Sequence, residues 1–262
     1  MIGVTETELT VAVDGGELWV GDTGGELSPL ILLHPGVGDS TIWDPVLPRL
    51  AARHRVVRYD VRGYGRSKPS TAPYRLLDDL LAVLDHLRLR RLHVVGCSMG
   101  GDPAVGLALA QPERVTGLVL VCPGLSGYPW PDEPELDAEY EALEQAGDTE
   151  GLVALAAREW AAAGTDEAVL AQLRSGTAAW PNEWQYKQEG EPTFDRLGEL
   201  AVPTVLMVGD RDRPPLVASN EEAAARIPGC RLVRMPGVDH LPPLRAPDLV
   251  AGTILDHFSG LR

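Results

Sequence analysis

The stretch from Leu92 to Ala110, "LHVVGCSMGGDPAVGLALA", constrains the fold more than any other part of the chain. An apolar run typical of a buried strand ends at Gly96, and a helix-like pattern begins at Gly100. A strand that passes almost directly into a helix is typical of a parallel sheet whose faces are covered by helices. Ser98 would then lie at the carboxyl edge of that sheet, where ligands bind in open α/β folds.

The rest of the chain repeats this alternation of strands and helices. We expect a hairpin where Asp14-Gly15-Gly16 separates two short apolar runs. The expected strands cover residues 9–13, 17–20, 29–34, 56–59, 92–96, 115–121, 202–209 and 231–235, and the expected helices cover residues 43–53, 76–87, 100–110, 221–227 and 248–258. The pattern predicts the α/β class, with a mostly parallel sheet and helices on both of its faces.

Residues 124–200 interrupt the alternation. This segment is acidic, rich in alanine and helix-like. It contains four of the six tryptophans: Trp130, Trp160, Trp180 and Trp184. We interpret it as a helical insertion between two strands of a core that residues 1–123 and 201–262 form together.

Composition and charge exclude several classes of partner. The 262 residues carry a formal net charge of −15, so the surface repels the phosphates of nucleic acids and of anionic membranes. The longest apolar runs are too short to span a bilayer, and the first residues, MIGVTETELT, lack the basic and apolar regions of a signal peptide. Three cysteines without metal-ligand spacing predict free thiols. We therefore expect a cytoplasmic protein.

Gly96, Ser98 and Gly100 form the pattern G-x-S-x-G at the predicted strand–helix junction. In such a junction the serine occupies a sharp, strained turn, and side chains at the two glycine positions would collide as strand and helix close around it. The turn exposes the hydroxyl beside a helix N-terminus, which favours negative charge. The pattern predicts a nucleophile. An ordinary glycine-rich turn is the alternative, and a phosphate-binding loop is disfavoured because no lysine follows the glycines.

A serine nucleophile needs a base, and an acid that orients the base. His240 follows the last predicted strand, in a loop at the same edge of the sheet as Ser98, which is the position expected of the base. Asp210 and Asp212 follow the preceding strand. We favour Asp212, because Asp210 lies at the strand end and Asp212 is far enough into the loop to reach His240. Asp239 is interpreted as a solvated loop charge.

The other five histidines lie within or beside predicted strands and helices. Four of them are interpreted as surface or packing residues: His54, His86, His93 and His257. His34 ends a strand near the site, so its role depends on the loop that follows it.

Four motifs together resemble those of the α/β-hydrolase superfamily: LILLHPGVGDS, YDVRGYGRS, GCSMGG and the pair GDRD and VDHLPP. The resemblance covers nearly the whole chain and is strongest to the esterase and enol-lactonase-like branch. It implies eight strands, a helical cap inserted after the sixth, and a catalytic triad of Ser98, Asp212 and His240. It calls for no metal, nucleotide or organic cofactor.

The resemblance also implies an oxyanion hole formed by two backbone N–H groups. One belongs to Met99, which follows the nucleophile. The other lies in the loop after the third strand, where relatives have His-Gly and this chain has His34-Pro35. Proline has no N–H group, so Gly36 is the predicted donor and Val37 the alternative. In this motif His34 is expected to brace the loop through hydrogen bonds.

These features predict a serine hydrolase that cleaves a carboxylic ester or a lactone through an acyl-enzyme. Carbon–carbon bond hydrolysis, acyl transfer and perhydrolysis can use the same site, and a small-molecule-binding protein on the same fold is the non-enzymatic alternative. The expected substrate is small and apolar, and these features do not specify an oligomeric state. Six aromatic residues of the insertion are candidates to line its pocket: Tyr128, Trp130, Trp160, Trp180, Trp184 and Tyr186.

Overall fold

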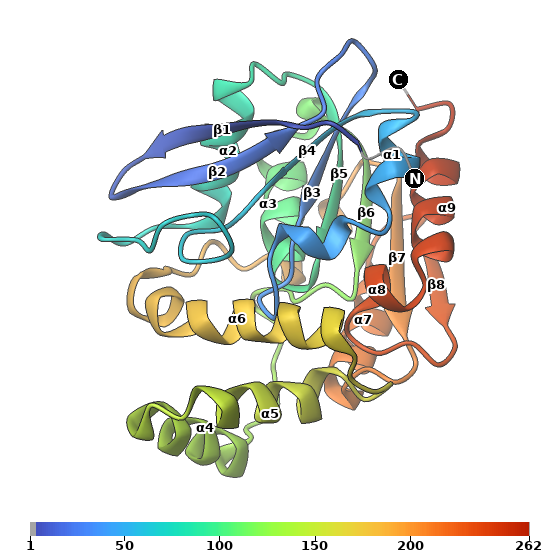
Figure 1. Cartoon of the computed structure of the whole chain (residues 1–262). Coiled ribbons are helices and arrows are strands. Elements are labelled where there is room, and N and C mark those ends of the chain that lie inside the picture. Colours follow the sequence, from blue (N-terminus) through green and yellow to red (C-terminus); the bar gives the residue numbers. More distant parts are fainter. Residues whose placement is uncertain (1–3, 262) are drawn as a thin grey trace.

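Eight strands form a single sheet in the part of the chain that the computed structural model describes, residues 4–261 (Figure 1). In chain order they are β1 (Thr7–Val13), β2 (Gly16–Asp22), β3 (Pro29–Leu33), β4 (Arg55–Tyr59), β5 (Leu92–Cys97), β6 (Val115–Val121), β7 (Thr204–Gly209) and β8 (Arg231–Met235). Across the sheet the order is β1-β2-β4-β3-β5-β6-β7-β8. β1 and β2 form the predicted antiparallel hairpin and β2 is antiparallel to β4, whereas every pair from β4 to β8 is parallel. The first three residues of the N-terminal segment considered above lie outside the described residues.

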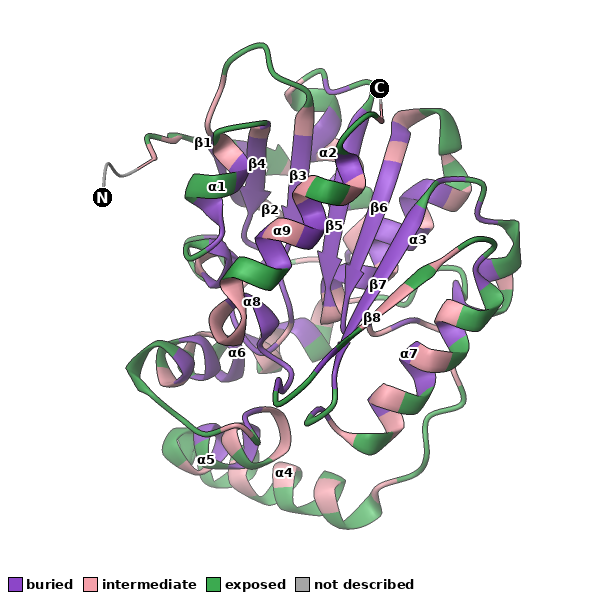
Figure 2. Ribbon diagram, turned by 90° about the vertical axis from the view of Figure 1, so that its right-hand side faces the viewer, coloured by how far each residue is buried: buried purple, intermediate pink, exposed green. Residues whose placement is uncertain are grey.

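Helices cover both faces of the sheet. On one face lie α2 (Leu76–His86), α3 (Gly101–Ala110) and α7 (Pro214–Arg226), and on the other α1 (Leu47–Ala51), α8 (Pro242–Arg245) and α9 (Pro247–Phe258). The strands permit this because they are apolar on both sides: in β3, Ile31 and Leu33 belong to one core, and Leu30 and Leu32 to the other. The central strands are accordingly buried (Figure 2). The predicted α/β class is confirmed.

Two predicted helices differ from the observed ones by more than one residue at an end. The region predicted as one helix, residues 43–53, contains the short 3-10 helix η1 (Ser40–Trp43) and then α1. Pro45 stands between the two and lacks the backbone N–H group that would continue the hydrogen bonds of a single helix. Helix α7 starts earlier than predicted, at Pro214, because proline is well tolerated in the first turn of a helix.

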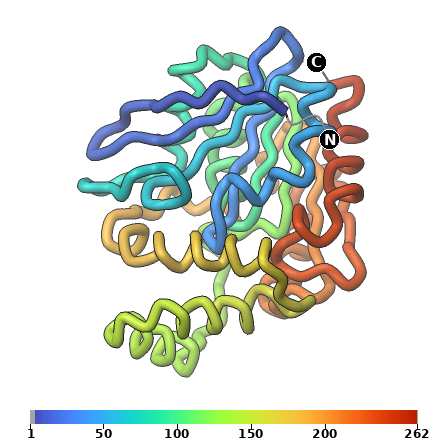
Figure 3. Tube along the Cα trace, viewed as in Figure 1, coloured from blue at the N-terminus to red at the C-terminus, as the bar shows by residue number. Residues whose placement is uncertain are grey.

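The residues between β6 and β7 form a group of helices at the carboxyl ends of the parallel strands (Figure 1). They are α4 (Pro134–Ala146), α5 (Thr149–Trp160), α6 (Glu167–Tyr186) and the 3-10 helix η4 (Phe194–Glu199). The trace in Figure 3 places α4 and α5 farther from the sheet than α6. Helix α6 contributes buried residues along much of its length, α5 contributes four and α4 contributes none, so α5 and α6 pack against the core and α4 does not. We refer to residues 124–200 as the helical segment. Within the described residues, no helix combines the length and apolar character needed to cross a membrane.

Candidate active site

Ser98 lies in the tight turn between β5 and α3, at the start of the 3-10 helix η2 (Ser98–Gly100). Its φ is +48°, a left-handed conformation that is strained for a residue with a side chain. A Cβ atom on Gly96 would lie 2.3 Å from the carbonyl oxygen of Gly100, and one on Gly100 would lie 2.7 Å from that of Leu33. Both positions therefore require glycine, for the steric reason inferred from the sequence.

His240 connects Ser98 to Asp212 through two short hydrogen bonds. Nε2 of His240 lies 2.7 Å from Oγ of Ser98, and Nδ1 lies 2.7 Å from Oδ2 of Asp212. An ionised carboxylate only accepts hydrogen bonds, so Nδ1 carries the proton and Nε2 can accept the proton of the serine hydroxyl. The side chains of His240 and Asp212 are 1% and 0% exposed, so water does not compete for the bond between them.

The other two carboxylates near His240 have different partners. Asp210 accepts a hydrogen bond from the N–H of Gly237 at 2.6 Å, which joins the loop after β7 to the loop after β8. Asp239 is fully buried, so its interpretation as a solvated charge is wrong. Its carboxylate binds the guanidinium of Arg245 and accepts a hydrogen bond from the N–H of Ala163 at 3.0 Å. These contacts tie the loop of His240 to the helical segment and leave the carboxylate of Asp239 buried between them.

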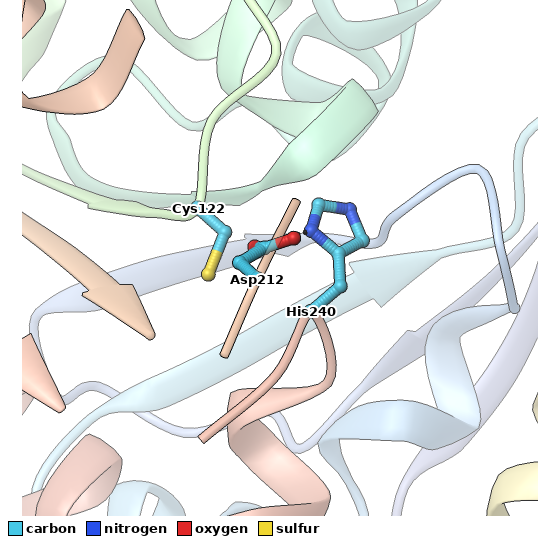
Figure 4. A group of neighbouring side chains, drawn as sticks. All are labelled: Cys122, Asp212 and His240. Atoms are coloured by element: carbon cyan, nitrogen blue, oxygen red, sulfur yellow. Dashed lines mark hydrogen bonds and ion pairs between the residues drawn. The ribbon is translucent and has the colours of Figure 1, made fainter. Parts of the chain in front are cut away.

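Cys122, which follows β6, lies beside the carboxylate of Asp212 (Figure 4). Its Sγ lies within 4.8 Å of ligand atoms of Asp212 and His240. Burial raises the pKa of the Cys122 thiol, so it stays protonated and neutral. These atom types occur in metal sites, but both imidazole nitrogens of His240 are hydrogen-bonded and a protonated thiol is a poor ligand. We therefore assign the cluster to the hydrogen-bonded site rather than to a metal.

Gly36, Val37 and Met99 border the same cavity as Ser98. A Cβ atom on Gly36 would lie 3.7 Å from Cβ of Met99, so the two residues predicted to supply oxyanion donors are neighbours in space. Met99 also precedes the N-terminus of α3, whose partial positive charge favours an anion.

His34 is buried and uses both of its ring nitrogens. The N–H of Val61 donates to Nε2 at 2.9 Å, so Nδ1 carries the proton and donates to the carbonyl oxygen of Pro35, also at 2.9 Å. The carbonyl of Pro35 and the N–H of Gly36 belong to one trans peptide and point in opposite directions. The hydrogen bond from His34 therefore fixes the direction of the Gly36 N–H, as a bracing residue would.

Helix α6 holds the same loop from another side. The indole Nε1 of Trp180 donates to the carbonyl oxygen of Gly36 at 2.7 Å, and Oε1 of Gln172 accepts a backbone hydrogen bond from the loop at 3.0 Å. A Cβ atom on Gly176 would lie 2.6 Å from the carbonyl carbon of Val37, so only glycine permits this approach. Gln172, Gly176 and Trp180 are four residues apart in sequence and form one face of α6.

Asp39 adds a charged contact between the loop and α6. Its carboxylate accepts hydrogen bonds from the hydroxyl of Ser175 at 2.7 Å and from the N–H of Thr41 at 2.8 Å. Burial opposes ionisation of this group, but the hydrogen bonds outweigh it and lower the pKa of Asp39. The ionised carboxylate caps η1 and keeps α6 attached to the loop.

A cavity of about 670 Å³ lies between Ser98 and the helical segment, within the size range of small-molecule sites. Four of the six predicted aromatic residues line it: Trp130, Trp160, Trp180 and Trp184. Tyr128 and Tyr186 lie outside it, because Tyr128 packs against Phe194 at a centroid distance of 4.8 Å and Tyr186 packs onto the core. Tyr140 of α4, which the sequence did not indicate, also lines the cavity.

Trp160, the last residue of α5, covers the imidazole of His240. The two ring centroids are 4.5 Å apart and the planes are inclined by 43°. The guanidinium of Arg213 lies 4.9 Å from the centroid of the indole. The end of α5 thus shields one side of the imidazole.

Asp102, in the first turn of α3, connects the two ends of the helical segment. Its Oδ1 accepts hydrogen bonds from the N–H of Ser126 at 2.9 Å, the hydroxyl of Ser126 at 2.7 Å and the hydroxyl of Thr193 at 2.6 Å. The chain therefore leaves the core and returns to it at one carboxylate, a few residues from Ser98.

A model of the alpha/beta hydrolase family matches residues 30–253, a range that includes Ser98, Asp212 and His240. The chain belongs to the alpha/beta hydrolase family. The resemblance inferred from its motifs is thereby confirmed.

Three proteins illustrate the range of this hydrolase family. Rhodomycin D methylesterase DauP from Streptomyces sp. strain C5 is 30% identical, over 97% of this chain and 96% of its own. The magnesium-chelatase 30 kDa subunit of Rhodobacter capsulatus is 32% identical, over 92% and 91%. The crystal structure of the enol-lactonase from Burkholderia xenovorans LB400 has the same fold, with a TM-score of 0.79, 24% identity and coverage of 96% and 100%. The relative named as a methylesterase agrees with the branch inferred from the sequence.

The hydrolase-family motifs of the chain do not include the contacts of α6. Gln172, Gly176 and Trp180 do not belong to any of the motifs by which the family was recognised. The signal that could have indicated them is their spacing of four residues within a helical pattern, with a glycine in the middle position. Tyr140 carries no such signal, because it lies in a helix without buried residues.

Proposed function

We propose that Ser98, His240 and Asp212 form a catalytic triad that hydrolyses carboxylic esters, including lactones. The observation that carries this proposal is the hydrogen-bonded chain of the three side chains, with two contacts of 2.7 Å, at the edge of a cavity of about 670 Å³. Membership of the alpha/beta hydrolase family and a relative named as a methylesterase support it.

In the first half of the reaction, Oγ of Ser98 attacks the ester carbonyl carbon while Nε2 of His240 takes the hydroxyl proton. Asp212 stabilises the imidazolium through Nδ1–H. The imidazolium then protonates the leaving alkoxide, which leaves an ester between Ser98 and the acyl group. In the second half, His240 takes a proton from water while the water oxygen attacks the acyl carbon, and the imidazolium then returns the proton to Oγ of Ser98 as its bond to the acyl group breaks and the acid is released.

The oxyanion that forms in both halves is proposed to accept hydrogen bonds from the N–H groups of Gly36 and Met99. His34 directs the first of these groups through the carbonyl of Pro35. Each donor of this kind is worth about 3–4 kcal/mol of transition-state stabilisation. The loop is held from both sides before substrate arrives, so little reorganisation is needed during the reaction.

We also propose that the helical segment, residues 124–200, acts as a cap inserted into the core of residues 1–123 and 201–262. The hydrogen bonds of Asp102 and Asp239 to the segment support a fixed seating of its ends over the site. Its tryptophans supply apolar walls for a small substrate. The free thiols of Cys97, Cys122 and Cys230 support the expected reducing, cytoplasmic setting.

Labelling with a fluorophosphonate probe, combined with a panel of methyl, aryl and lactone esters, tests the proposal. We expect stoichiometric labelling of Ser98, no labelling of Ser98→Ala, and hydrolysis of at least one ester class. Adding an alcohol or hydrogen peroxide reports acyl transfer and perhydrolysis, and a vinylogous diketone reports carbon–carbon cleavage. If the diketone were the only compound turned over, the proposed activity would be carbon–carbon bond hydrolysis instead of ester hydrolysis.

A small-molecule-binding role without turnover is the second candidate. The observation behind it is that one relative similar over most of both chains is named as a subunit of magnesium chelatase and not as a hydrolase. A folded protein that neither reacts with the probe nor cleaves any ester of the panel would support this role and reject the triad.

A further inference from the structure

The positive side chains that line the cavity are mostly neutralised by partners. Lys187 is paired with Glu183, and Arg213 with Glu133 and Glu159. Arg196 is paired with Glu199. These cations are therefore already engaged, and a substrate carboxylate that entered the cavity would have to displace an existing acid to bind one of them.

Arg75 is the one lining cation that has no ion pair among residues 4–261. It is exposed at the N-terminus of α2, at the rim of the cavity. At such an exposed position a single ion pair with a substrate carboxylate contributes little to the free energy of binding.

The negative side chains of the lining show the opposite pattern. Five of them have no ion pair within the part of the chain that the structure describes: Asp78, Asp102, Asp137, Glu189 and Glu191. The whole chain also carries a formal net charge of −15. The field in the cavity therefore attracts positive charge and repels negative charge.

Aromatic rings form the apolar part of the lining. Trp180 and Trp184 stack at a centroid distance of 5.8 Å, and the ring of Tyr140 meets that of Trp184 edge-on at 4.3 Å. Trp184 is 48% exposed and Trp130 is 43% exposed, although both line the cavity. Such indole faces bind flat aromatic groups and, when negative charge is nearby, cations.

We propose that the cavity selects esters whose non-reacting part is an aromatic ring system that is neutral or positively charged, and that it disfavours esters bearing a carboxylate. This substrate class rests on the proposed ester hydrolysis. Uncompensated acids repel a second carboxylate in the substrate, and the exposed indoles provide the surface against which its rings stack.

Three methyl 2-naphthoates that differ only in the substituent far from the ester test the charge preference. The substituents are aminomethyl, hydroxymethyl and carboxylate, and kcat/KM is measured at pH 7.5 in low salt and at 0.5 M NaCl. We expect the carboxylate ester to be at least about 10-fold poorer than the other two in low salt, with a smaller gap in high salt because exposed charges are screened. A carboxylate ester that is hydrolysed as well as the others, or better, overturns the proposal.

A matched pair of charge reversals locates the effect. Glu191→Lys changes an acid of the lining, and Glu113→Lys makes the same change in the loop before β6, at the opposite end of the sheet. We expect Glu191→Lys to raise kcat/KM for the carboxylate ester by about 5-fold relative to kcat/KM for the aminomethyl ester. Glu113→Lys should leave this ratio unchanged. Equal effects of the two variants would mean that net charge, not the cavity, sets the preference, and would contradict the proposal.

The aromatic part is tested with Trp184→Ala. We expect KM for the hydroxymethyl naphthoate to rise about 10-fold more than KM for methyl butyrate, which has no ring to stack. Leu249→Ala removes an equally exposed apolar side chain of α9 that lies outside the cavity, and it serves as the control. Equal changes for both esters reject stacking. If Ser98→Ala retains all activity, the proposed function itself fails, which is a different result from losing the substrate preference.

Discussion

A buried histidine lies near each end of strand β5, and the two histidines have different environments. His93, near the amino end, is 2% exposed and stacks on Phe258 at a centroid distance of 4.3 Å. At the carboxyl end, His240 lies between the carboxylate of Asp212 and the hydroxyl of Ser98. Both imidazoles are buried, so burial does not distinguish them; their partners do.

Burial and the neighbouring His54 and His257 lower the pKa of His93 to about 4. Among the described residues no carboxylate acts on this imidazole, which stays neutral at ordinary pH. At the other end, the carboxylate of Asp212 can stabilise a transient imidazolium and the hydroxyl of Ser98 can supply its proton. A buried histidine is therefore placed to act as a base where one ring nitrogen has an acid and the other has a proton donor.

The largest expected effect is at the carboxyl end. Ser98→Ala removes the proposed nucleophile from a turn whose backbone alanine can occupy, so we expect kcat on any activated ester to fall at least about 10⁴-fold while the circular dichroism spectrum is retained. Ser259→Ala, at the exposed end of α9, is the control and should keep full activity. Ordinary turnover by a folded Ser98→Ala protein would show that the carboxyl end of β5 does not supply the nucleophile.

The second prediction separates the acids of the loop after β7. Asp212→Asn removes the charge that faces Nδ1 of His240, so we expect kcat to fall about 10⁴-fold. Asp210→Asn changes a carboxylate that binds only the N–H of Gly237 among the described residues, so its loss should stay below about 10-fold. The measurement is kcat of both variants on one ester. The reverse order would transfer the role of acid to Asp210.

The third prediction concerns the contact of α6 with the loop after β3, which carries the proposed oxyanion donor Gly36. Trp180→Phe keeps an aromatic ring in place but removes the hydrogen bond to the carbonyl of Gly36. We expect a decrease in kcat of about 10-fold with little change in KM, because the loop that carries the proposed oxyanion donor would be held less firmly, which weakens the transition state more than the bound substrate. Trp184→Phe is the matched control. If Trp180→Phe raised KM and left kcat unaltered, Trp180 would be only a wall of the cavity.

The smallest effect on activity is expected at the amino end of β5. The pKa of His93 is lower in the folded protein than in the unfolded chain, where it is about 6.5, so its contribution is complete above pH 6.5 and is lost as the pH falls toward 4. We expect His93→Gln to reduce the loss of stability between pH 7 and pH 4 by about 2 kcal/mol relative to the wild type. Its kcat at pH 7.5 should stay within about twofold of the wild-type value.

Denaturant melts of the two proteins at pH 7, 5.5 and 4 provide the measurement for His93. Parallel pH curves for wild type and His93→Gln would show that this histidine does not contribute to acid unfolding. A large loss of kcat at pH 7.5 would show that the two ends of the strand are not independent.

The sequence predicted the parallel sheet and the strand-end residues well, because both depend on local order. Continuous apolar runs such as that of β3 indicate a strand buried on both faces. Gly96 and Gly100 indicate a turn in which the backbone leaves no space for a side chain at either position. Asp239 was misinterpreted for the opposite reason. Its partners, Arg245 and Ala163, are fixed by the packing of the helical segment, and loop position alone does not reveal them.

The sequence by itself determined the α/β class, the turn at Ser98 and the loops that carry Asp212 and His240. These properties follow from hydrophobic periodicity, glycine sterics and the rule that parallel strands bring their carboxyl ends to one edge. Only the tertiary structure decided that Trp180, Gly176 and Gln172 hold the loop after β3, and which tryptophans face the cavity. A helix pattern gives the face of a helix but not the element that covers it, because that choice depends on contacts between residues far apart in the chain.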